Sequence, residues 1–177
     1  YLAQTRNFDG TAVLIFQPGE EGYGGAREMI ADGLFTRWNV DAVYALHNWP
    51  SLEPGQIGVS PGPTMAAADK VEIIVTGRGG HGAHPYQAID PVLVAAHIIT
   101  AAQSIVSRNV SPLDSAVVSL CAMEAGCLDA MSVIPDQAKL VGTIRTFKTN
   151  VQEMVETRLR LLAQSIAQGF GATAQVK

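Results

Sequence analysis

The order of apolar patterns from residue 70 onward constrains the fold of this chain more than any other feature. Residues 70–76 alternate between apolar and polar side chains, as in a half-buried strand. Asp90-Pro91 then marks a helix start, because aspartate is a favoured N-cap and proline suits the first helical position. The apolar residues that follow carry the predicted helix to Val106. Further patterns predict strands over 115–123 and 138–146, a helix over 151–168 and a strand over 172–176.

This order, β-α-β-β-α-β, predicts the split-βαβ or ferredoxin-like arrangement, in which two helices cover one face of an antiparallel sheet. Residues 51–65 are rich in proline and glycine and are expected to connect two parts of the chain. We therefore predict two domains, residues 1–69 and residues 70–177.

Residues 1–69 follow a different pattern, that of a parallel α/β sheet. The apolar run 11–17 predicts a strand buried on both faces, and a second run, 42–46, predicts another. Between them, residues 26–31 have helical character, and Gly33 is expected to be the C-cap. We interpret this region as a fragment of a larger α/β domain, in which ligands gather beyond the carboxyl ends of the strands.

Two adjacent carboxylates, Glu20 and Glu21, come directly after the first of these runs, and His47 comes directly after the second. Neighbouring carboxylates repel each other, and a bound cation would compensate. One glutamate could bind a divalent metal while the other moves a proton to and from a water molecule. The alternative is a solvated loop in which both glutamates face water.

A glycine-rich loop with two histidines, Gly77-Arg78-Gly79-Gly80-His81-Gly82-Ala83-His84-Pro85, follows the strand predicted over 70–76. Glycines let the backbone turn and approach a ligand closely. A histidine in such a loop could act as an acid, a base or an oxyanion donor. A structural role without chemistry is the alternative.

Composition excludes several classes of protein. The net charge of -4 leaves no basic surface for nucleic acid, and no cluster of lysine and arginine indicates a membrane patch. Two cysteines do not make a disulfide scaffold, and we find no signal peptide and no apolar run that we expect to span a bilayer. We therefore expect a cytoplasmic protein without a nucleic-acid or membrane partner.

Five motifs in order resemble the metal-dependent amidohydrolases. This group includes hippurate hydrolases, N-acyl-amino-acid amidohydrolases and plant indoleacetyl-amino-acid hydrolases, within the clan of dinuclear aminoacylases and carboxypeptidases. Its members carry an inserted lid domain, through which they dimerise. The motifs are Gln17-Pro18-Gly19-Glu20-Glu21-Gly22, Leu46-His47-Asn48-Trp49-Pro50, the histidine loop, Val133-Ile134-Pro135-Asp136 and Gly142-Thr143-Ile144-Arg145-Thr146-Phe147.

The resemblance implies a fold, an activity and a role for individual residues. Residues 1–69 would be part of the catalytic domain, and residues 70–177 would be the ferredoxin-like lid of a homodimer. Glu20 matches the general base, and Glu21 and His47 match ligands of a dinuclear site for zinc, manganese, nickel or cobalt. His81 matches the lid histidine that reaches the other subunit's active site and stabilises the oxyanion. Arg145 matches the arginine that receives the substrate's carboxylate, which suits its planar fork.

Two departures from the family's pattern stand out. Ser132 occupies the position before Val-Ile-Pro where the family has a substrate-binding asparagine. The family also takes metal ligands from a His-x-Cys-Gly-His-Asp motif upstream of Tyr1 and from a histidine beyond Lys177. We therefore expect the chain to be an internal piece of a longer enzyme that hydrolyses N-acyl amino acids, inactive when alone. The alternatives are a non-catalytic dimerisation or binding module and a degenerate homologue, for which Ser132 is the one positive sign.

Overall fold

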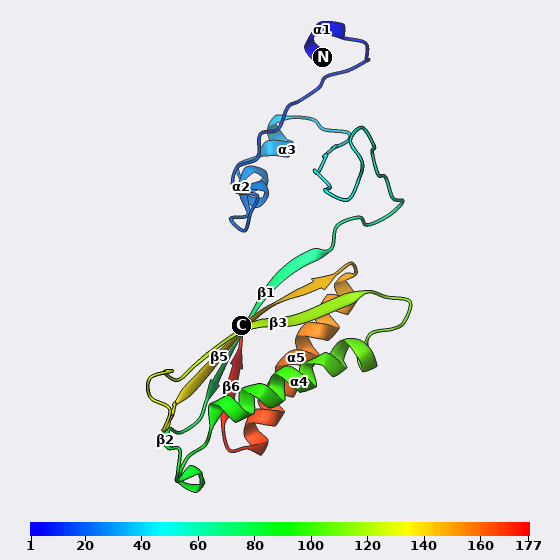
Figure 1. The fold of residues 1–177 in the computed structure, drawn as a ribbon. Helices are drawn as coiled ribbons and strands as arrows, with labels where there is room; N and C mark the ends of the chain where they lie inside the picture. The colour runs from blue at the N-terminus through cyan, green and yellow to red at the C-terminus, as the bar shows by residue number, and fades with distance from the viewer. The chain divides into compact units, whose positions relative to one another are not determined.

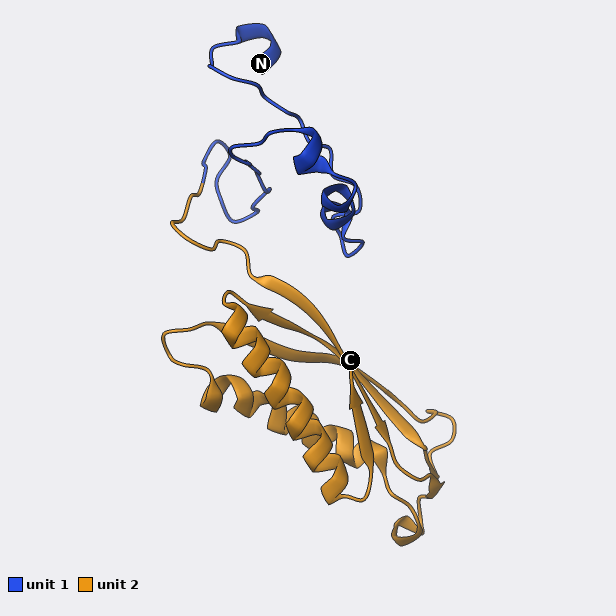
Figure 2. Ribbon diagram, turned by 180° about the vertical axis from the view of Figure 1, so that it is seen from behind, with its two compact units in different colours: residues 1–57 blue, residues 58–177 orange.

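The structure is a computed structural model that describes residues 1–177. The chain divides into two compact units, residues 1–57 and residues 58–177, shown in different colours in Figure 2. The buried apolar residues lie almost wholly in the second unit, between Val71 and Val176. The second unit therefore holds the hydrophobic core.

The first unit contains three short helices, α1 (Leu2–Thr5), α2 (Gly25–Ala31) and α3 (Leu34–Arg37). The helix expected near residues 26–31 is confirmed, but its C-cap is Asp32 and not Gly33 as expected. Gly33 follows with a positive φ of 91° and is the N-cap of α3. The strands predicted over 11–17 and 42–46 are wrong, because neither segment pairs with another strand. A strand needs a neighbour to satisfy its backbone N–H and C=O groups, and the side chains of these segments remain exposed, such as Leu14 at 70% and Tyr44 at 92%.

The second unit is built on a four-stranded antiparallel sheet in the order β3-β5-β1-β6. Its helices α4 and α5 cover the same face of that sheet and pack against each other, as Figure 1 shows. The predicted order of strands and helices from residue 70 onward is confirmed. The bounds are β1 (Ala67–Thr76), α4 (Pro91–Asn109), β3 (Ala116–Ala125), β5 (Gln137–Thr146), α5 (Thr149–Gly169) and β6 (Thr173–Val176).

Three short elements lie between these: β2 (Gly80–His81), the 3₁₀ helix η1 (Pro85–Gln87) and β4 (Val133–Ile134). β2 and β4 pair with each other in a separate two-stranded sheet, with His81 opposite Val133. The histidine loop and the Val-Ile-Pro-Asp motif are therefore joined, although about fifty residues separate them in the sequence.

The core follows from the strand alternation and the helix stripes. Val71, Ile73 and Val75 of β1 alternate with more exposed residues, as predicted. The buried stripe of α5 repeats every four residues, and Met154, Leu162 and Ile166 lie at its half-buried margins. The stripe consists of Val151, Val155, Leu159, Ala163 and Ala167.

Helix α4 begins as the sequence predicts, since the Asp90 side chain accepts a hydrogen bond from Val92 N at 2.8 Å. By length and composition it could cross a membrane, which corrects the expectation that no run of this chain could do so. In the structure, however, α4 is a core helix, because one side of it is buried. The fully buried side chains on that side include Val94, Ile98 and Ile105.

Candidate functional site

The histidine loop leaves the end of β1 and is held on two sides by backbone hydrogen bonds. On one side, Gly77 N donates to Asp136 O at 2.9 Å, and Gly82 N donates to Ser132 O at 2.8 Å. On the other side, Arg78 and Ile89 exchange both of their backbone hydrogen bonds, at 2.9 and 2.8 Å. These bonds fix the backbone around His81 even though its side chain is exposed.

Glycine is required in this loop by close packing. A Cβ atom on Gly77 would lie 2.1 Å from Ile89 O. A Cβ on Gly79 would lie 2.8 Å from both Asp136 Oδ1 and Ile134 O. The loop therefore approaches its neighbours more closely than any residue with a side chain could.

The imidazole of His81 is oriented by its own loop. Its Nδ1 accepts a hydrogen bond from Ala83 N at 3.1 Å, and His84 N donates to His81 O at 2.8 Å. The His84 ring meets the His81 ring edge-on, with the ring centroids 5.5 Å apart. Because Nδ1 is the acceptor, the neutral ring carries its proton on Nε2, so Nε2 is a hydrogen-bond donor.

Ser132 lies beside His81. Its carbonyl receives the Gly82 N–H, and the next residue, Val133, pairs with His81 across the β2–β4 sheet. The structure thus brings together two of the predicted site residues from different motifs.

Arg145 lies elsewhere on the second unit. It is exposed on β5, opposite Ala68 of β1 and Val117 of β3. At a rise of ~3.4 Å per residue, it lies about 27 Å along β5 from Gln137, the residue that follows the Val-Ile-Pro-Asp motif. One copy of the second unit therefore cannot bring Arg145 and His81 to the same small molecule.

Glu20, Glu21 and His47 lie in the first unit, and all three are exposed. The glutamates occupy a turn in which Gly22 N donates to Glu20 O at 2.9 Å. The His47 ring meets the Trp49 ring edge-on, and its Nδ1 lies 2.6 Å from Asn48 O. No three His, Cys, Asp or Glu side chains of the chain converge as metal ligands. Carboxylate and imidazole suit a transition metal chemically, but this structure does not assemble them into a centre.

Asp136 was not assigned a role from the sequence, although it ends a motif that the resemblance rested on. Its Oδ1 accepts a hydrogen bond from Gly79 N at 2.8 Å. The Asp136 side chain thereby connects the Val-Ile-Pro-Asp motif to the histidine loop. The carboxylate directly after Val-Ile-Pro was the sequence signal that could have suggested a role for Asp136. Only the fold shows that this carboxylate accepts a hydrogen bond from the Gly79 backbone.

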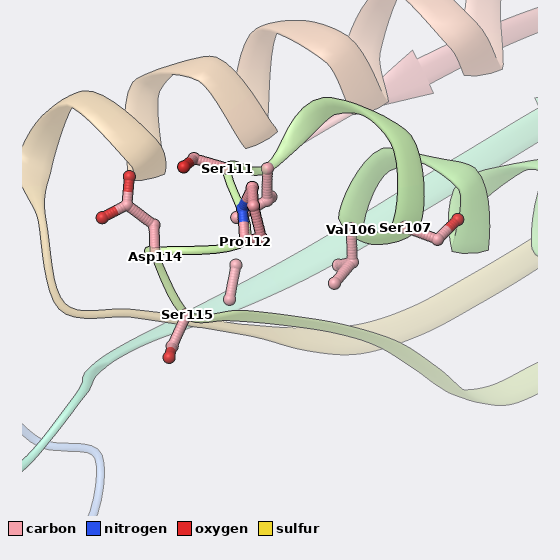
Figure 3. A pocket seen from close by; sticks show the side chains of 8 residues that line it. Val106, Ser107, Ser111, Pro112, Asp114 and Ser115 are labelled. Carbon is pink, nitrogen blue, oxygen red and sulfur yellow. The ribbon is translucent and has the colours of Figure 1, made fainter.

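The groups with shifted pKa values, and a hollow in the second unit, lie away from these residues. The hydrogen bond from Lys139 lowers the pKa of Glu72, and the same bond raises the pKa of Lys139. A hollow of ≈ 570 Å³ lies where α4 connects to β3, and Figure 3 shows Asp114 among its lining side chains. No residue predicted to act in catalysis or binding lines it.

An α/β chain with a carboxylate pair, an exposed imidazole on a fixed loop and an exposed arginine carries the side chains that hydrolases of charged amides use. The model of peptidase family M20/M25/M40 matches residues 1–165, and the chain belongs to this family.

Similar proteins include named enzymes. The chain is 45% identical over 168 residues to N-acetylcysteine deacetylase of Bacillus subtilis and 44% identical over 168 residues to hippurate hydrolase of Campylobacter jejuni. In each case the match covers 95% of this chain and 43% of the relative, so the chain spans less than half of their length.

A solved structure is similar as well. The YXEP protein of Bacillus subtilis, described as a dinuclear metal-binding peptidase of the M20 family, matches with a TM-score of 0.68 and 37% identity. That match covers 92% of this chain and 38% of the other chain.

Proposed function

We propose that the whole protein containing this chain is a metal-dependent amidohydrolase that cleaves N-acyl amino acids into a carboxylic acid and an amino acid. The observation that carries this proposal is the fixed histidine loop, which presents Nε2–H of His81 as a donor in a chain 45% identical to N-acetylcysteine deacetylase. The similarity to hippurate hydrolase supports the same class of substrate.

In this proposal residues 1–69 are part of the catalytic domain, and Glu20 is its general base. Glu20 takes a proton from the attacking water as the water oxygen bonds to the amide carbon, and it returns the proton to the amine nitrogen when the C–N bond breaks. Glu21 and His47 are proposed ligands of a divalent metal in the whole protein. Since this chain does not itself assemble a metal centre, we derive no step through the metal.

The proposed substrate contacts come from the second unit. The Nε2–H of His81 would donate to the oxyanion of the tetrahedral intermediate, and the hydroxyl of Ser132, next to it, would contact the substrate. The exposed guanidinium of Arg145 would bind the carboxylate of the amino-acid part in a bidentate manner.

We further propose that residues 70–177 form a ferredoxin-like lid through which two copies of the protein dimerise. The strand order β3-β5-β1-β6 with both helices on one face supports this assignment. So does the separation of His81 from Arg145, because two copies could supply the two groups to one substrate. β3 is an edge strand of the four-stranded sheet and could pair with β3 of a second copy of the protein. A non-catalytic dimerisation module is the second candidate, and this free edge favours it too.

The test is hydrolysis of N-acetylcysteine and hippurate by the whole protein, with and without a metal chelator. We expect Glu20→Gln to lower kcat by about 10²–10⁴ with little change in KM, because the general base is lost while binding is retained. Glu28→Gln is the matched control, since Glu28 is an exposed glutamate of the same unit on α2.

Full activity of Glu20→Gln would refute the assigned base. No hydrolysis of any N-acyl amino acid by the metal-loaded protein would favour the dimerisation module. The isolated 177-residue chain is expected to show no hydrolysis.

A further inference from the structure

Asp136 connects the Val-Ile-Pro-Asp motif to the histidine loop through its side chain. Its carboxylate accepts the Gly79 N–H at 2.8 Å, and its carbonyl accepts the Gly77 N–H at 2.9 Å. We propose that Asp136 is a positioning residue for His81: its carboxylate fixes the loop so that His81 presents Nε2–H outward. This inference rests on the proposed role of His81.

The contacts form a continuous path from Asp136 to the imidazole. Beyond Gly79, the backbone of Gly80 and His81 pairs with Ile134 and Val133. Gly82 N then donates to Ser132 O at 2.8 Å. Residues 132–136 thus act as a template along which the loop lies, and Asp136 holds the end where the loop leaves β1.

The last step of the path orients the ring. The turn closed by the bond from His84 N to His81 O places Ala83 N 3.1 Å from Nδ1 of His81. This bond forms only while the loop keeps its turn. Displacement of the loop at Gly79 would therefore release Nδ1 and let the ring rotate.

A carboxylate is suited to this task because an ionised acceptor makes a stronger hydrogen bond than a neutral one. Gly79 allows the close approach, since a Cβ there would lie 2.8 Å from Asp136 Oδ1. Both Asp136 and His81 are exposed, so burial of these two side chains does not fix the loop.

The experiment measures solvent exchange of the backbone amides of Gly79, Gly82 and Ala83 by NMR in the 177-residue chain. In Asp136→Ala, we expect exchange to become about tenfold faster at all three amides. Gly79 N–H loses its hydrogen bond to the carboxylate, and the displaced loop weakens the bonds of Gly82 and Ala83 as well. The ring nitrogen signals of His81, one of four histidines, are expected to move toward those of free imidazole. Asp136→Asn keeps an acceptor oxygen and is expected to accelerate exchange by only about two- to threefold.

Asp114→Ala is the matched control. Asp114 lies in the loop before β3, outside the histidine loop, and its carboxylate forms an ion pair with Lys148. It is expected to leave the three amides unchanged. Faster exchange at Gly79 alone, with Ala83 and the His81 ring as in the native chain, would overturn the proposal. If Asp136→Ala does not fold, Asp136→Asn decides: native exchange at Gly82 and Ala83 overturns the proposal, and faster exchange supports it.

A kinetic readout in the whole protein separates this inference from the proposed function. Asp136→Ala is expected to lower kcat for N-acetylcysteine by about 10- to 100-fold with KM nearly unchanged, because a misplaced donor affects the transition state more than binding. Asp136→Asn should recover most of that loss. If amide exchange changes as expected but neither the native whole protein nor its variants hydrolyse the substrate, the positioning role stands and the amidohydrolase assignment fails.

Discussion

Gly79 shows how one residue type determines the geometry of the histidine loop. It has no positive φ that would require glycine, and its backbone fits an ordinary residue. The requirement comes from its neighbours, because a Cβ would lie 2.8 Å from the Ile134 carbonyl as well as from the Asp136 carboxylate. Any side chain at this position forces the two motifs apart.

We therefore predict that Gly79→Ala destabilises the second unit by about 1–3 kcal/mol, the usual cost of overpacking, and disturbs the amide signals of Val133, Ile134 and Asp136. Gly169→Ala is the control, because a Cβ there meets nothing within 4 Å at the end of α5. Urea denaturation and amide spectra of both variants check this. Equal stability of the two variants would contradict the prediction.

Strands β1 and β5 are joined by a side-chain interaction that the sequence alone does not reveal. Glu72 of β1 and Lys139 of β5 form an ion pair at 2.8 Å, and Lys177 lies 3.8 Å from the same carboxylate. The two elements are far apart in the sequence, and their register, with Glu72 opposite Val141, places the charges together.

The Lys139→Met substitution is predicted to raise the pKa of Glu72 toward its ordinary value of 4.5, because the hydrogen bond from Lys139 is the largest cause that lowers it. Lys70→Met is the control, with a smaller expected rise, since Lys70 contributes only a weaker charge interaction. An NMR titration of the Glu72 carboxyl in each variant measures this directly. A larger effect of Lys70→Met would contradict the assigned cause.

The pH dependence follows from the sign of the shift. Because the folded-state pKa of Glu72 is lowered, its contribution to stability is present above the unfolded-state pKa and is lost as the pH falls through the folded-state value. Lys139 has a raised pKa, so its contribution is lost only as the pH rises through that raised value. The pair therefore contributes across neutral pH, weakly, because both side chains are only half-buried and water screens their charges.

At the scale of the whole molecule, the positions of His81 and Arg145 indicate how two copies would work together. The two residues lie in the same unit, but Arg145 lies about 27 Å along β5 from Gln137, at the end of β5 next to the Val-Ile-Pro-Asp motif. If both groups act on one N-acyl amino acid, they come from different copies.

Mixing two inactive variants of the whole protein tests that arrangement. We expect His81→Ala and Arg145→Ala each to lose most hydrolysis of N-acetylcysteine, and unfolding and refolding them together to restore about a quarter of native activity, because half of randomly formed dimers would carry one intact site. The control is each variant refolded alone. An inactive mixture that still forms dimers would show that both residues act from the same copy.

The sequence by itself determined the second unit. The alternation of residues 70–76 and the repeat of α5 are local signals that report which face of an element is buried. The Asp90-Pro91 cap is a local signal that marks where a helix begins. Residues 11–17 and 42–46 do not form the predicted strands, because an apolar run becomes a strand only when a neighbouring strand pairs with its backbone N–H and C=O groups.

Only the tertiary structure decided which predicted residues lie together. It joined His81 to Ser132 through the β2–β4 pairing, placed Arg145 near the far end of β5, and gave Asp136 a hydrogen-bond partner that its motif did not reveal. The physical reason is that local patterns act within one element, whereas a site depends on strand register and on backbone bonds between residues distant in sequence.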